Sequence, residues 1–386
     1  MEERPVVVVG GGPAGIAAAL ALKEVGVRPL VIERADEAGS SWRRRYDRLR
    51  LNTCRPFSHL PKRSWPKGTP MFPSRDEVIQ HIQRHASEEG IDLQLGTEVE
   101  RIDRADGDGW TVDTSSGVVS TAQVIVATGY ENVPFIPEWN GREEFPGALI
   151  HSSEYRNPEQ FRDRRVLVVG PGSSGMEIAH DVASGGAGAV WLSARTPPNI
   201  LLREGPGGLP GDMIGVALLR FPPRFADAVA RFGRRMDLGD LTEYGLPVPE
   251  EGVFSRMYRL GVAPAIVDRE VIDAIKEGKI EVVRGVESVD GSSFVLADGT
   301  RLEPEAVVCA TGYRPGLESL VGHLDVLNER GLPSAVGEQP AAPGLRFIGY
   351  VPRPGMLGNN GKEARRIART VVRELRAAPA SAPIPA

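Results

Sequence analysis

The chain has few cysteines, no long apolar run and no strong excess of charge. Its two cysteines, Cys54 and Cys309, form no Cys-x-x-Cys pair, so the sequence carries neither a disulfide framework nor a recognisable redox dithiol. No stretch approaches the roughly 18 consecutive apolar residues of a membrane-spanning helix. The opening MEERPVVVVGGG is too acidic, and its apolar part too short, for a secretory signal. We therefore expect a cytoplasmic protein without an integral membrane span, and a disordered Ala/Pro-rich tail over 377–386.

The charge balance and the histidines limit the function further. The net charge is −5, so the overall balance does not indicate a nucleic acid or an anionic membrane as partner. His81 and His85 lie one turn apart on a predicted helix over 74–90, which a Ser74–Glu77 capping box begins. Because no cysteine or carboxylate accompanies the pair in a ligand pattern, we interpret both histidines as surface residues and predict no metal site.

Two segments repeat one plan, which is typical of dinucleotide binding. Residues 5–33 and 165–193 each contain a continuous Val/Leu run, a G-x-G-x-x-G turn, a helix of small residues and a second apolar strand. The first glycine allows the tight bend, the second lets a pyrophosphate approach the backbone, and the third lets the helix pack on the strand. Two copies in this context are far more specific than one. The glycines are Gly10, Gly12 and Gly15, then Gly170, Gly172 and Gly175.

The two copies differ where their second strands end. The first copy has Glu33 at this place, and a carboxylate accepts hydrogen bonds from ribose hydroxyls. The second copy has Ser193, followed two residues later by Arg195. A hydroxyl and a guanidinium favour the 2′-phosphate that a carboxylate would repel. The second copy is therefore predicted to prefer NADPH to NADH, unless Arg195 is an ordinary solvated surface arginine.

A second internal echo predicts how the domains are connected. VIVATGY (124–130) and VVCATGY (307–313) are apolar strands that end in Thr-Gly, before and after the second dinucleotide segment. We predict an α/β fold with two Rossmann-like dinucleotide-binding domains. The first is discontinuous, over 1–157 and 310–386, and the second, over 158–309, is inserted into it.

An insertion over 205–260 fits no regular unit. Residues 213–235 are apolar with interspersed arginines, which is an amphipathic pattern. Three interpretations stay open: a lid over a substrate channel, an ordinary packed insertion, or a helix at a membrane surface.

One string between the two copies connects the sequence to a known family. Phe145, Gly147, His151 and Tyr155 occupy the fixed positions of F-x-G-x-x-x-H-x-x-x-Y. With the two fingerprints, this string resembles the flavin-containing monooxygenases. The likeness runs through GSSWRRRYDRLRLNT, PNILLRE, LGDLTEYGLP and CATGYRP, and is closest to the YUCCA-type branch of plant indole-3-pyruvate monooxygenases and their bacterial relatives.

The resemblance implies an NADPH-dependent flavin monooxygenase. FAD would bind the first copy and NADPH the second, and one atom of O2 would enter a small organic substrate through a C4a-(hydro)peroxyflavin. N- or S-oxygenation and Baeyer–Villiger or 2-oxo-acid oxygenation both remain open. The hard chemistry would belong to the cofactors. Neither nucleic acid nor an integral membrane span is expected, and the oligomeric state is left open, a homodimer included.

Residue roles are carried over from the family by position. Asn52 is the one catalytic candidate, because an amide can donate to the oxygen adduct without titrating; its place departs from the His that the YUCCA-type branch often has, and a turn-forming Asn is the alternative. His151 would be structural or switching, in a linker beside the NADPH site. The predicted cofactor-binding residues are Gly10, Gly12, Pro13, Ala14, Gly15, Glu33, Arg34, Ser41, Trp42, Val99, Ala127, Thr128, Gly129, His151, Gly170, Gly172, Ser173, Ser174, Gly175, Ser193, Arg195, Thr311, Gly312 and Gly358.

Other functions are compatible with two dinucleotide fingerprints. A pyridine-nucleotide disulfide reductase shares the plan, but it needs a dithiol that Cys54 and Cys309 do not supply in sequence. An NADPH oxidase, or a catalytically lapsed FAD- and NADPH-binding flavoprotein that acts as a sensor or partner, would keep the same glycines. An oxidase would differ from a monooxygenase by releasing peroxide, and a lapsed flavoprotein would differ by consuming no NADPH.

Overall fold

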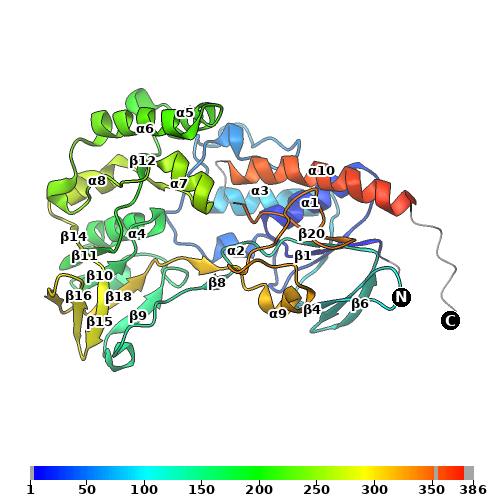
Figure 1. Ribbon diagram of the computed structural model, residues 1–386, viewed down its shortest axis with the longest axis horizontal. Helices are drawn as coiled ribbons and strands as arrows, with labels where there is room; N and C mark the ends of the chain where they lie inside the picture. Colours follow the sequence, from blue (N-terminus) through cyan, green and yellow to red (C-terminus); the bar gives the residue numbers. More distant parts are fainter. Residues whose placement is uncertain (1–3, 352–354, 378–386) are drawn as a thin grey trace. The chain divides into compact units, whose positions relative to one another are not determined.

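Two five-stranded parallel sheets organise the chain, each in a unit of its own (Figure 1). The computed structural model describes residues 4–351 and 355–377. From residue 378 on, the tail that the sequence predicts to be disordered lies outside these residues. The first unit comprises Met1–Arg44, Arg55–Val133 and Arg314–Ala386, and the second comprises Arg45–Cys54 and Pro134–Tyr313.

The sheet of the first unit has the order β20–β7–β1–β2–β3, with all its pairs parallel. Its strands are β1 (Val6–Val9), β2 (Leu30–Ile32), β3 (Asp92–Gln94), β7 (Gln123–Val126) and β20 (Leu345–Phe347). The central strands β1 and β7 are buried along their whole length. Continuous β-branched runs form such strands because both faces of the sheet are covered.

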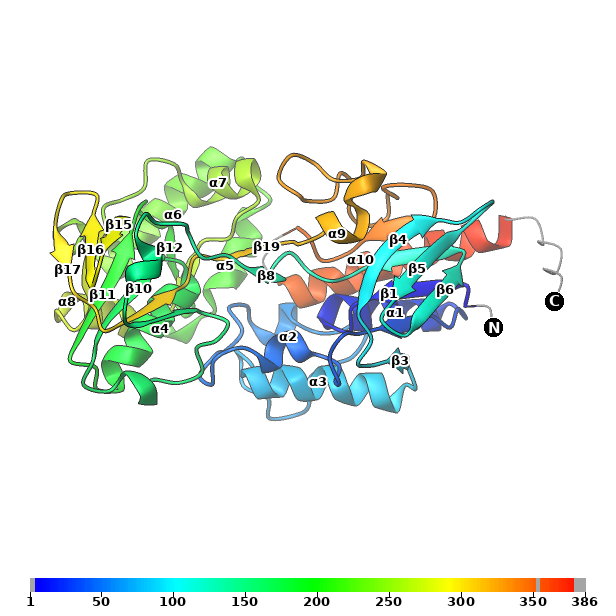
Figure 2. The same cartoon turned by 90° about the horizontal axis from the view of Figure 1, so that it is seen from below.

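Helices cover this sheet, and an antiparallel meander extends the unit. The longer helices are α1 (Pro13–Glu24), α3 (Arg75–Glu88) and α10 (Met356–Ala377), of which α1 and α10 lie side by side. The short ones are α2 (Ser40–Arg43), α9 (Glu318–Val321), η1 (Arg55–Phe57) and η6 (Gly322–Leu324). Figure 2 shows the meander β4 (Val99–Arg104), β5 (Trp110–Thr114) and β6 (Gly117–Thr121), which shares one apolar core with the parallel sheet.

The sheet of the second unit has the order β14–β11–β10–β18–β9, again with parallel pairs. Its strands are β9 (Ala148–His151), β10 (Arg165–Val169), β11 (Ala189–Ala194), β14 (Glu281–Arg284) and β18 (Ala306–Cys309). Strand β9 corrects the placement of His151 in a linker, because His151 is the last residue of this strand. Its four residues pair with β18 at the edge of the sheet, a partner more than 150 positions away that no local pattern identifies.

The remaining elements of the second unit lie around its sheet. They include α4 (Ser173–Ser184), α8 (Arg269–Lys276), η2 (Arg142–Glu144), η3 (Glu159–Phe161), the pair β12 (Ile200–Leu202) and β13 (Ala265–Val267), and the meander β15 (Val286–Asp290), β16 (Ser293–Leu296) and β17 (Arg301–Leu302). The insertion folds into η4 (Pro206–Gly208), α5 (Gly211–Leu218), α6 (Pro223–Leu238), η5 (Thr242–Tyr244) and α7 (Val253–Leu260). Two short paired strands, β8 (Val133–Pro134) and β19 (Tyr313–Arg314), lie where the chain passes between the units.

The units divide the chain at other places than the sequence predicts. The passages fall at 133/134 and 313/314 instead of 157/158 and 309/310, and residues 45–54 join the second unit. The reason for the first difference is β9, which belongs to the second sheet and takes its flanking residues with it. Among the described residues, no helix is both long and apolar enough to cross a membrane.

Candidate functional site

The first fingerprint forms the strand–turn–helix that the sequence predicts. Gly10 has φ +106°, a backbone angle that residues with a side chain rarely adopt, and a Cβ there would lie 2.9 Å from the carbonyl oxygen of Ala127. A Cβ on Gly15 would lie 1.9 Å from the carbonyl oxygen of Gly10. At Gly12 the backbone is extended and a Cβ would meet only Ser41 Oγ, at 3.6 Å. Packing within the protein therefore requires glycine at two places, whereas at Gly12 the surroundings leave a ligand room to approach.

Glu33 is fastened to this turn. Its Oε2 accepts a hydrogen bond from the backbone N–H of Gly11 at 2.6 Å, and its Oε1 accepts from Ala35 N at 3.0 Å and from Ser40 Oγ at 3.2 Å. The side chain is only 7% exposed. A carboxylate held by three donors keeps one direction, as a hydrogen-bond acceptor for a ribose requires.

Other predicted residues of the first unit gather near the same turn or at sheet ends. Ser41 and Trp42 lie in α2, and the N–H of Gly39, which precedes that helix, donates to Gly11 O at 2.9 Å. Arg34 lines a cavity of about 410 Å³ and donates to Asn132 Oδ1 at 2.9 Å. Pro13 and Ala14 begin α1, Val99 begins β4, Ala127, Thr128 and Gly129 follow β7, and Gly358 lies in the first turn of α10.

Gly358 allows α10 to begin close to another segment. A Cβ there would lie 2.3 Å from the carbonyl oxygen of Phe57, and one on Gly355 would lie 2.9 Å from the same atom. Gly358 lies in the first turn of α10, which begins at Met356. The positive end of the helix dipole lies at this terminus.

The second fingerprint repeats the geometry of the first. Gly170 has φ +109°, and a Cβ on Gly175 would lie 1.8 Å from Gly170 O. At Gly172 the backbone is extended, and no described atom lies within 4 Å of the place of a Cβ. Ser173 begins α4 and its Oγ accepts from Ile266 N at 2.9 Å; Ser174 follows it, half-buried. As in the first fingerprint, no contact within the described protein requires glycine at the middle position. A ligand that lies close to the backbone would require it.

The residues after the second fingerprint lie differently from each other. Ser193 is 1% exposed, and its Oγ donates to the carbonyl oxygen of Arg284 at 2.9 Å, so its proton is not available to a phosphate. Arg195 is exposed just beyond β11. Arg284, which the sequence analysis missed, ends the neighbouring strand β14 opposite Ala194 and is also exposed. Two guanidinium groups thus lie at the C-terminal ends of the neighbouring strands β11 and β14. An arginine directly before Gly285 at a strand end was the available signal.

The string 145–155 forms the edge of the second sheet. Phe145 packs on Phe294 with ring centroids 5.0 Å apart. A Cβ on Gly147 would lie 2.7 Å from the carbonyl oxygen of Glu305, so only glycine allows the approach to β18. Tyr155 is fully buried and donates from Oη to Asp181 Oδ2 at 2.7 Å, which ties the string to α4.

His151 closes this arrangement against the second Thr-Gly. Its Nε2 lies 3.0 Å from Gly312 O and must donate, while its Nδ1 accepts from Ser153 N at 3.1 Å. Burial lowers the pKa of His151, and the ring is 1% exposed. A neutral imidazole with both nitrogens engaged is a structural link and not an acid–base group. Thr311, beside it, donates its hydroxyl to Phe135 O.

Asn52 lies in a buried polar network of the second unit. Its Oδ1 accepts from Arg203 Nη2 at 3.0 Å, so the amide Nδ2 is the donor that remains; it has no hydrogen-bond partner among the described residues. Arg203 is 2% exposed and also pairs with Glu177 and Asp268. Burial raises the pKa of Glu177. Burial would also raise the pKa of Asp268, but the positive charges of Arg203 and Arg50 hold that pKa below its ordinary value. The sequence analysis missed this arginine.

With this geometry in place, comparison with known proteins identifies the family. Residues 7–199 match the family described as pyridine nucleotide-disulphide oxidoreductase. The chain is 34% identical over 373 residues to the indole-3-pyruvate monooxygenase YUCCA1 of Oryza sativa subsp. japonica, covering 95% of this chain and 90% of that protein. The chain belongs to the class B flavin monooxygenases. The resemblance inferred from the string 145–155 is confirmed, and the protein is an oxidoreductase of the flavin monooxygenase type.

Solved structures show the same fold as this monooxygenase. The flavin-containing monooxygenase from Stenotrophomonas maltophilia superposes with a TM-score of 0.75 at 22% identity, covering 97% of this chain and all of that one. A structure described as OTEMO complex with FAD and NADP gives a TM-score of 0.72 at 17% identity, covering 96% and 84%. Both support an α/β fold with parallel sheets, and FAD and NADP occur together on that fold.

The cysteines of the monooxygenase do not form the dithiol of a disulfide reductase. Cys54 and Cys309 are both free and buried. Burial raises the pKa of Cys309 to about 12, so its thiol stays protonated at neutral pH and is a poor nucleophile. Among the described residues, no cluster of three or more His, Cys, Asp or Glu side chains could hold a metal ion.

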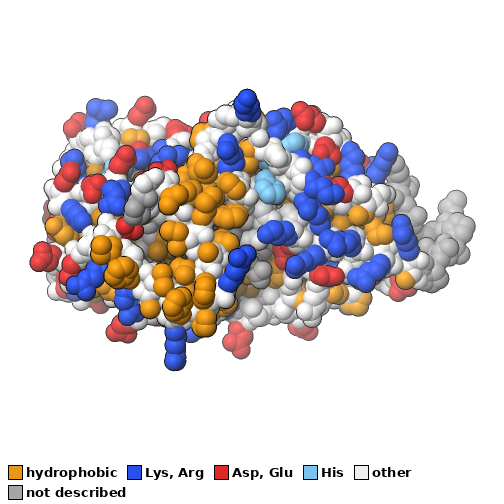
Figure 3. All heavy atoms as spheres, turned by 90° about the horizontal axis from the view of Figure 1, so that it is seen from above, with side chains coloured by type: hydrophobic (Ala, Val, Ile, Leu, Met, Phe, Trp, Pro, Cys, Tyr) orange, Lys and Arg blue, Asp and Glu red, His pale blue; other side chains and the backbone are white. Residues whose placement is uncertain are grey.

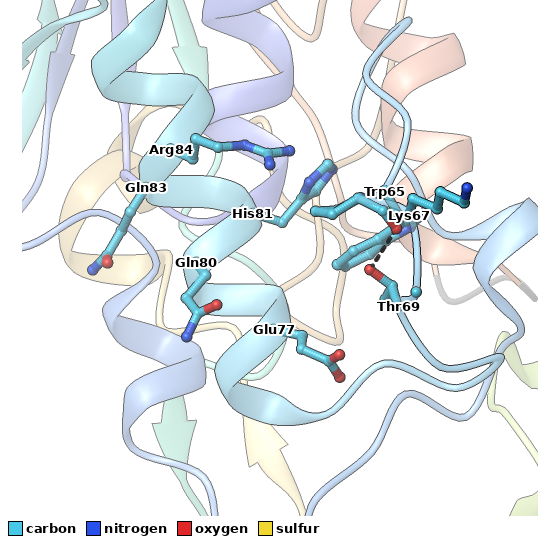
Figure 4. Close-up of a pocket in the computed structure, with 10 residues that line it drawn as sticks. Trp65, Lys67, Thr69, Glu77, Gln80, His81, Gln83 and Arg84 are labelled. Carbon is cyan, nitrogen blue, oxygen red and sulfur yellow. Dashed lines mark hydrogen bonds between the residues drawn. The ribbon is translucent and has the colours of Figure 1, made fainter.

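The predicted surface pair of histidines is wrong for His81. This residue of α3 is 2% exposed and stacks on Trp65 with ring centroids 4.2 Å apart. Figure 4 shows it reaching, with Arg84, toward the loop of Trp65 and Lys67, where a cavity of about 560 Å³ lies. Burial lowers the pKa of His81 to about 3. The capping box of Ser74 that starts the helix is confirmed.

Proposed function

We propose that this monooxygenase uses FAD held by the first unit and NADPH held by the second to insert one atom of O2 into a small organic substrate. In this arrangement two Rossmann-like domains bind the cofactors, and the NADPH domain is inserted into the FAD domain. The contrast between the two fingerprints supports it most: a carboxylate fixed beside one turn, and two exposed guanidinium groups beside the other.

The first unit suits a dinucleotide with a free adenosine ribose. Glu33 offers its carboxylate at the end of β2, and the adjacent cavity at Arg34 has room for a base and ribose. The turn at Gly12 leaves its backbone open to the pyrophosphate, at the N-terminus of α1. FAD has such a free adenosine ribose, so it requires no positively charged side chain at this place.

The second unit suits a dinucleotide with a 2′-phosphate. Arg195 and Arg284 end neighbouring parallel strands, so both can donate to one phosphate at that edge. The sequence analysis predicted Ser193 as a phosphate donor. Its hydroxyl already donates to Arg284 O, so it joins the strand that carries Arg195 to the strand that carries Arg284. NADPH is therefore the expected coenzyme.

When bound and reduced, the flavin supplies the activation of O2; the chain's own residues bind, orient and donate. Asn52 is the proposed donor to the reacting oxygen. Because Arg203 donates to its Oδ1, the amide cannot flip without losing that bond, and Nδ2 is kept as the free donor. The amide does not titrate, so it stabilises negative charge without delivering a proton.

A 2-oxo acid with an aromatic side chain is the first substrate to test. Relatives that cover nearly the whole chain are named for indole-3-pyruvate. Soft nitrogen and sulfur nucleophiles are the second class. The assay follows NADPH oxidation, O2 uptake, H2O2 release and product, with indole-3-pyruvate or a tertiary amine added.

The expected result is NADPH consumption that substrate stimulates, with oxygenated product in proportion and little H2O2. NADPH consumption that yields only H2O2 with every substrate would make the protein an oxidase. No consumption by flavin-loaded protein would favour a catalytically lapsed binding protein. Either of these outcomes refutes the proposal.

A further inference from the structure

Helix α6 of the insertion carries an apolar stripe on its solvent side. The stripe consists of Phe225, Val229, Phe232 and Met236, which are 52%, 37%, 68% and 71% exposed. These positions are spaced by four, three and four residues, so they lie along one face of the helix. Figure 3 shows hydrophobic side chains gathered over this part of the molecule. Neighbouring α5 adds exposed Met213 and Ile214, and Phe221 follows it.

The opposite face of α6 fixes this orientation. Ala226 is buried against Val253 and Phe254 of α7. Asp227, 8% exposed, accepts hydrogen bonds from Phe254 N at 2.7 Å and from the hydroxyl of Ser255, and so caps the start of α7. A helix held by a buried carboxylate cannot roll its apolar stripe inward without breaking the cap. The interpretation of 205–260 as an ordinary packed insertion therefore does not apply to this face.

A row of arginines borders the stripe on one side. Arg224, Arg231 and Arg235 are exposed, and at about 100° per residue they fall on the same flank of α6. They make no side-chain hydrogen bond or ion pair with the described residues. From Arg220 to the end of α6 at Leu238 there are five arginines and two acids, the buried Asp227 and the half-buried Asp237, in a chain whose net charge is −5. The positive charge is therefore concentrated where the apolar side chains are exposed.

We propose that α6 binds the surface of an anionic lipid bilayer, with the stripe in the headgroup region and the arginine row on lipid phosphates. Large apolar side chains beside unpaired basic residues are the features of helices that lie in the membrane plane. The same row makes a second copy of the chain a poorer occupant, since neither the apolar stripe nor the arginine row contains a carboxylate that could pair with the arginines of another copy. The protein would dock reversibly by this face.

The experiment measures sedimentation of the flavin-loaded full chain with large unilamellar vesicles. One set is phosphatidylcholine alone, and the other contains about 30% phosphatidylglycerol. We expect binding to the anionic set, weakened by high salt. Phe232→Glu should lower the partition coefficient at least about tenfold, because a charge replaces the phenyl that the bilayer would bury. Arg231→Gln with Arg235→Gln should lower binding to the anionic set by a similar factor.

Val118→Glu is the matched control. Val118 is 57% exposed on β6 of the first unit, whereas the insertion belongs to the second unit, so this variant should bind as the parent does. Far-ultraviolet circular dichroism and the flavin spectrum establish that each variant is folded. Absence of parent binding to anionic vesicles overturns the proposal. So does a dimer, detected by analytical ultracentrifugation, that Phe232→Glu dissociates while neither protein binds vesicles.

Discussion

Replacing Arg195 by Ala should reduce the use of NADPH much more than that of NADH. Arg195 lies just after β11 and Arg284 ends β14, and the register of these parallel strands places Ala194 opposite Arg284. Both arginines are exposed, and neither forms a side-chain hydrogen bond or ion pair within the described chain. Their charge is thus available to a ligand at this edge, and the 2′-phosphate is the only part that distinguishes the two coenzymes.

The size of the effect follows from the bond that is lost. A hydrogen bond to a charged group contributes about 1.5–3 kcal/mol, which corresponds to a fall of roughly 10- to 150-fold in kcat/KM for NADPH. The same range applies to Arg284→Ala. The double variant should lose less than the product of the two, because both groups bind one phosphate. With NADH, which lacks this phosphate, kcat/KM should change about twofold at most.

Steady-state oxidation of each coenzyme, at fixed O2 and substrate, measures these ratios. Arg301→Ala is the control, since Arg301 lies on β17 of the same unit and pairs with Asp290 at the surface. It should alter neither ratio. Equal losses with NADPH and NADH in the Arg195 variant, or no loss with either, would contradict the assignment of a 2′-phosphate to this edge.

Three further outcomes are expected. Gly172→Ala should raise the KM for NADPH and leave the free energy of urea unfolding unchanged, because no described atom lies within 4 Å of the new Cβ, whereas Gly175→Ala, with a Cβ 1.8 Å from a carbonyl oxygen, should cost more than about 2 kcal/mol. His81, with a folded pKa of about 3 and an ordinary value of 6.5, is protonated more readily when unfolded, so its contribution to stability is complete above pH 6.5 and falls toward pH 3. At pH 5 this loss is about 2 kcal/mol, and His81→Phe should remove it from the difference in unfolding free energy between pH 7.5 and 5. Asn52→Ala should keep NADPH oxidation but yield more H2O2 and less product; unchanged coupling would remove Asn52 from the oxygen chemistry.

Local physics made the fingerprints predictable. Each turn depends on residues within about ten positions: a buried strand, a glycine that must take positive φ, and a helix that begins at once. Gly10 and Gly170 have the φ values that this requires. The capped start of α3 was predictable for the same reason, since Ser74 and Glu77 are three residues apart and bond to each other.

What depended on distant segments was missed. His81 is buried because Trp65, from a loop, stacks on it, and the helix pattern alone cannot reveal that partner. In the sequence nothing distinguishes Arg203 from the other arginines. In the structure it bonds Asn52, Glu177 and Asp268, which come from three other segments. A buried charge is recognised only when its partners are known, because unpaired it would be too costly to bury.

The string 145–155 shows how spacing and distant contacts combine. Its glycine, histidine and tyrosine recur every four residues, a spacing that would place all three on one face of a strand and along one stripe of a helix. In the structure the three residues follow neither pattern. Gly147 lies against the backbone of Glu305, and His151 ends β9 and bonds Gly312, which follows the neighbouring strand β18. Tyr155 bonds Asp181 on α4. Each side chain fastens the sheet edge to a different element around the second fingerprint. Because His151 bonds the Gly312 carbonyl one residue before β19 begins, it fixes the backbone at the point where the chain leaves the second sheet.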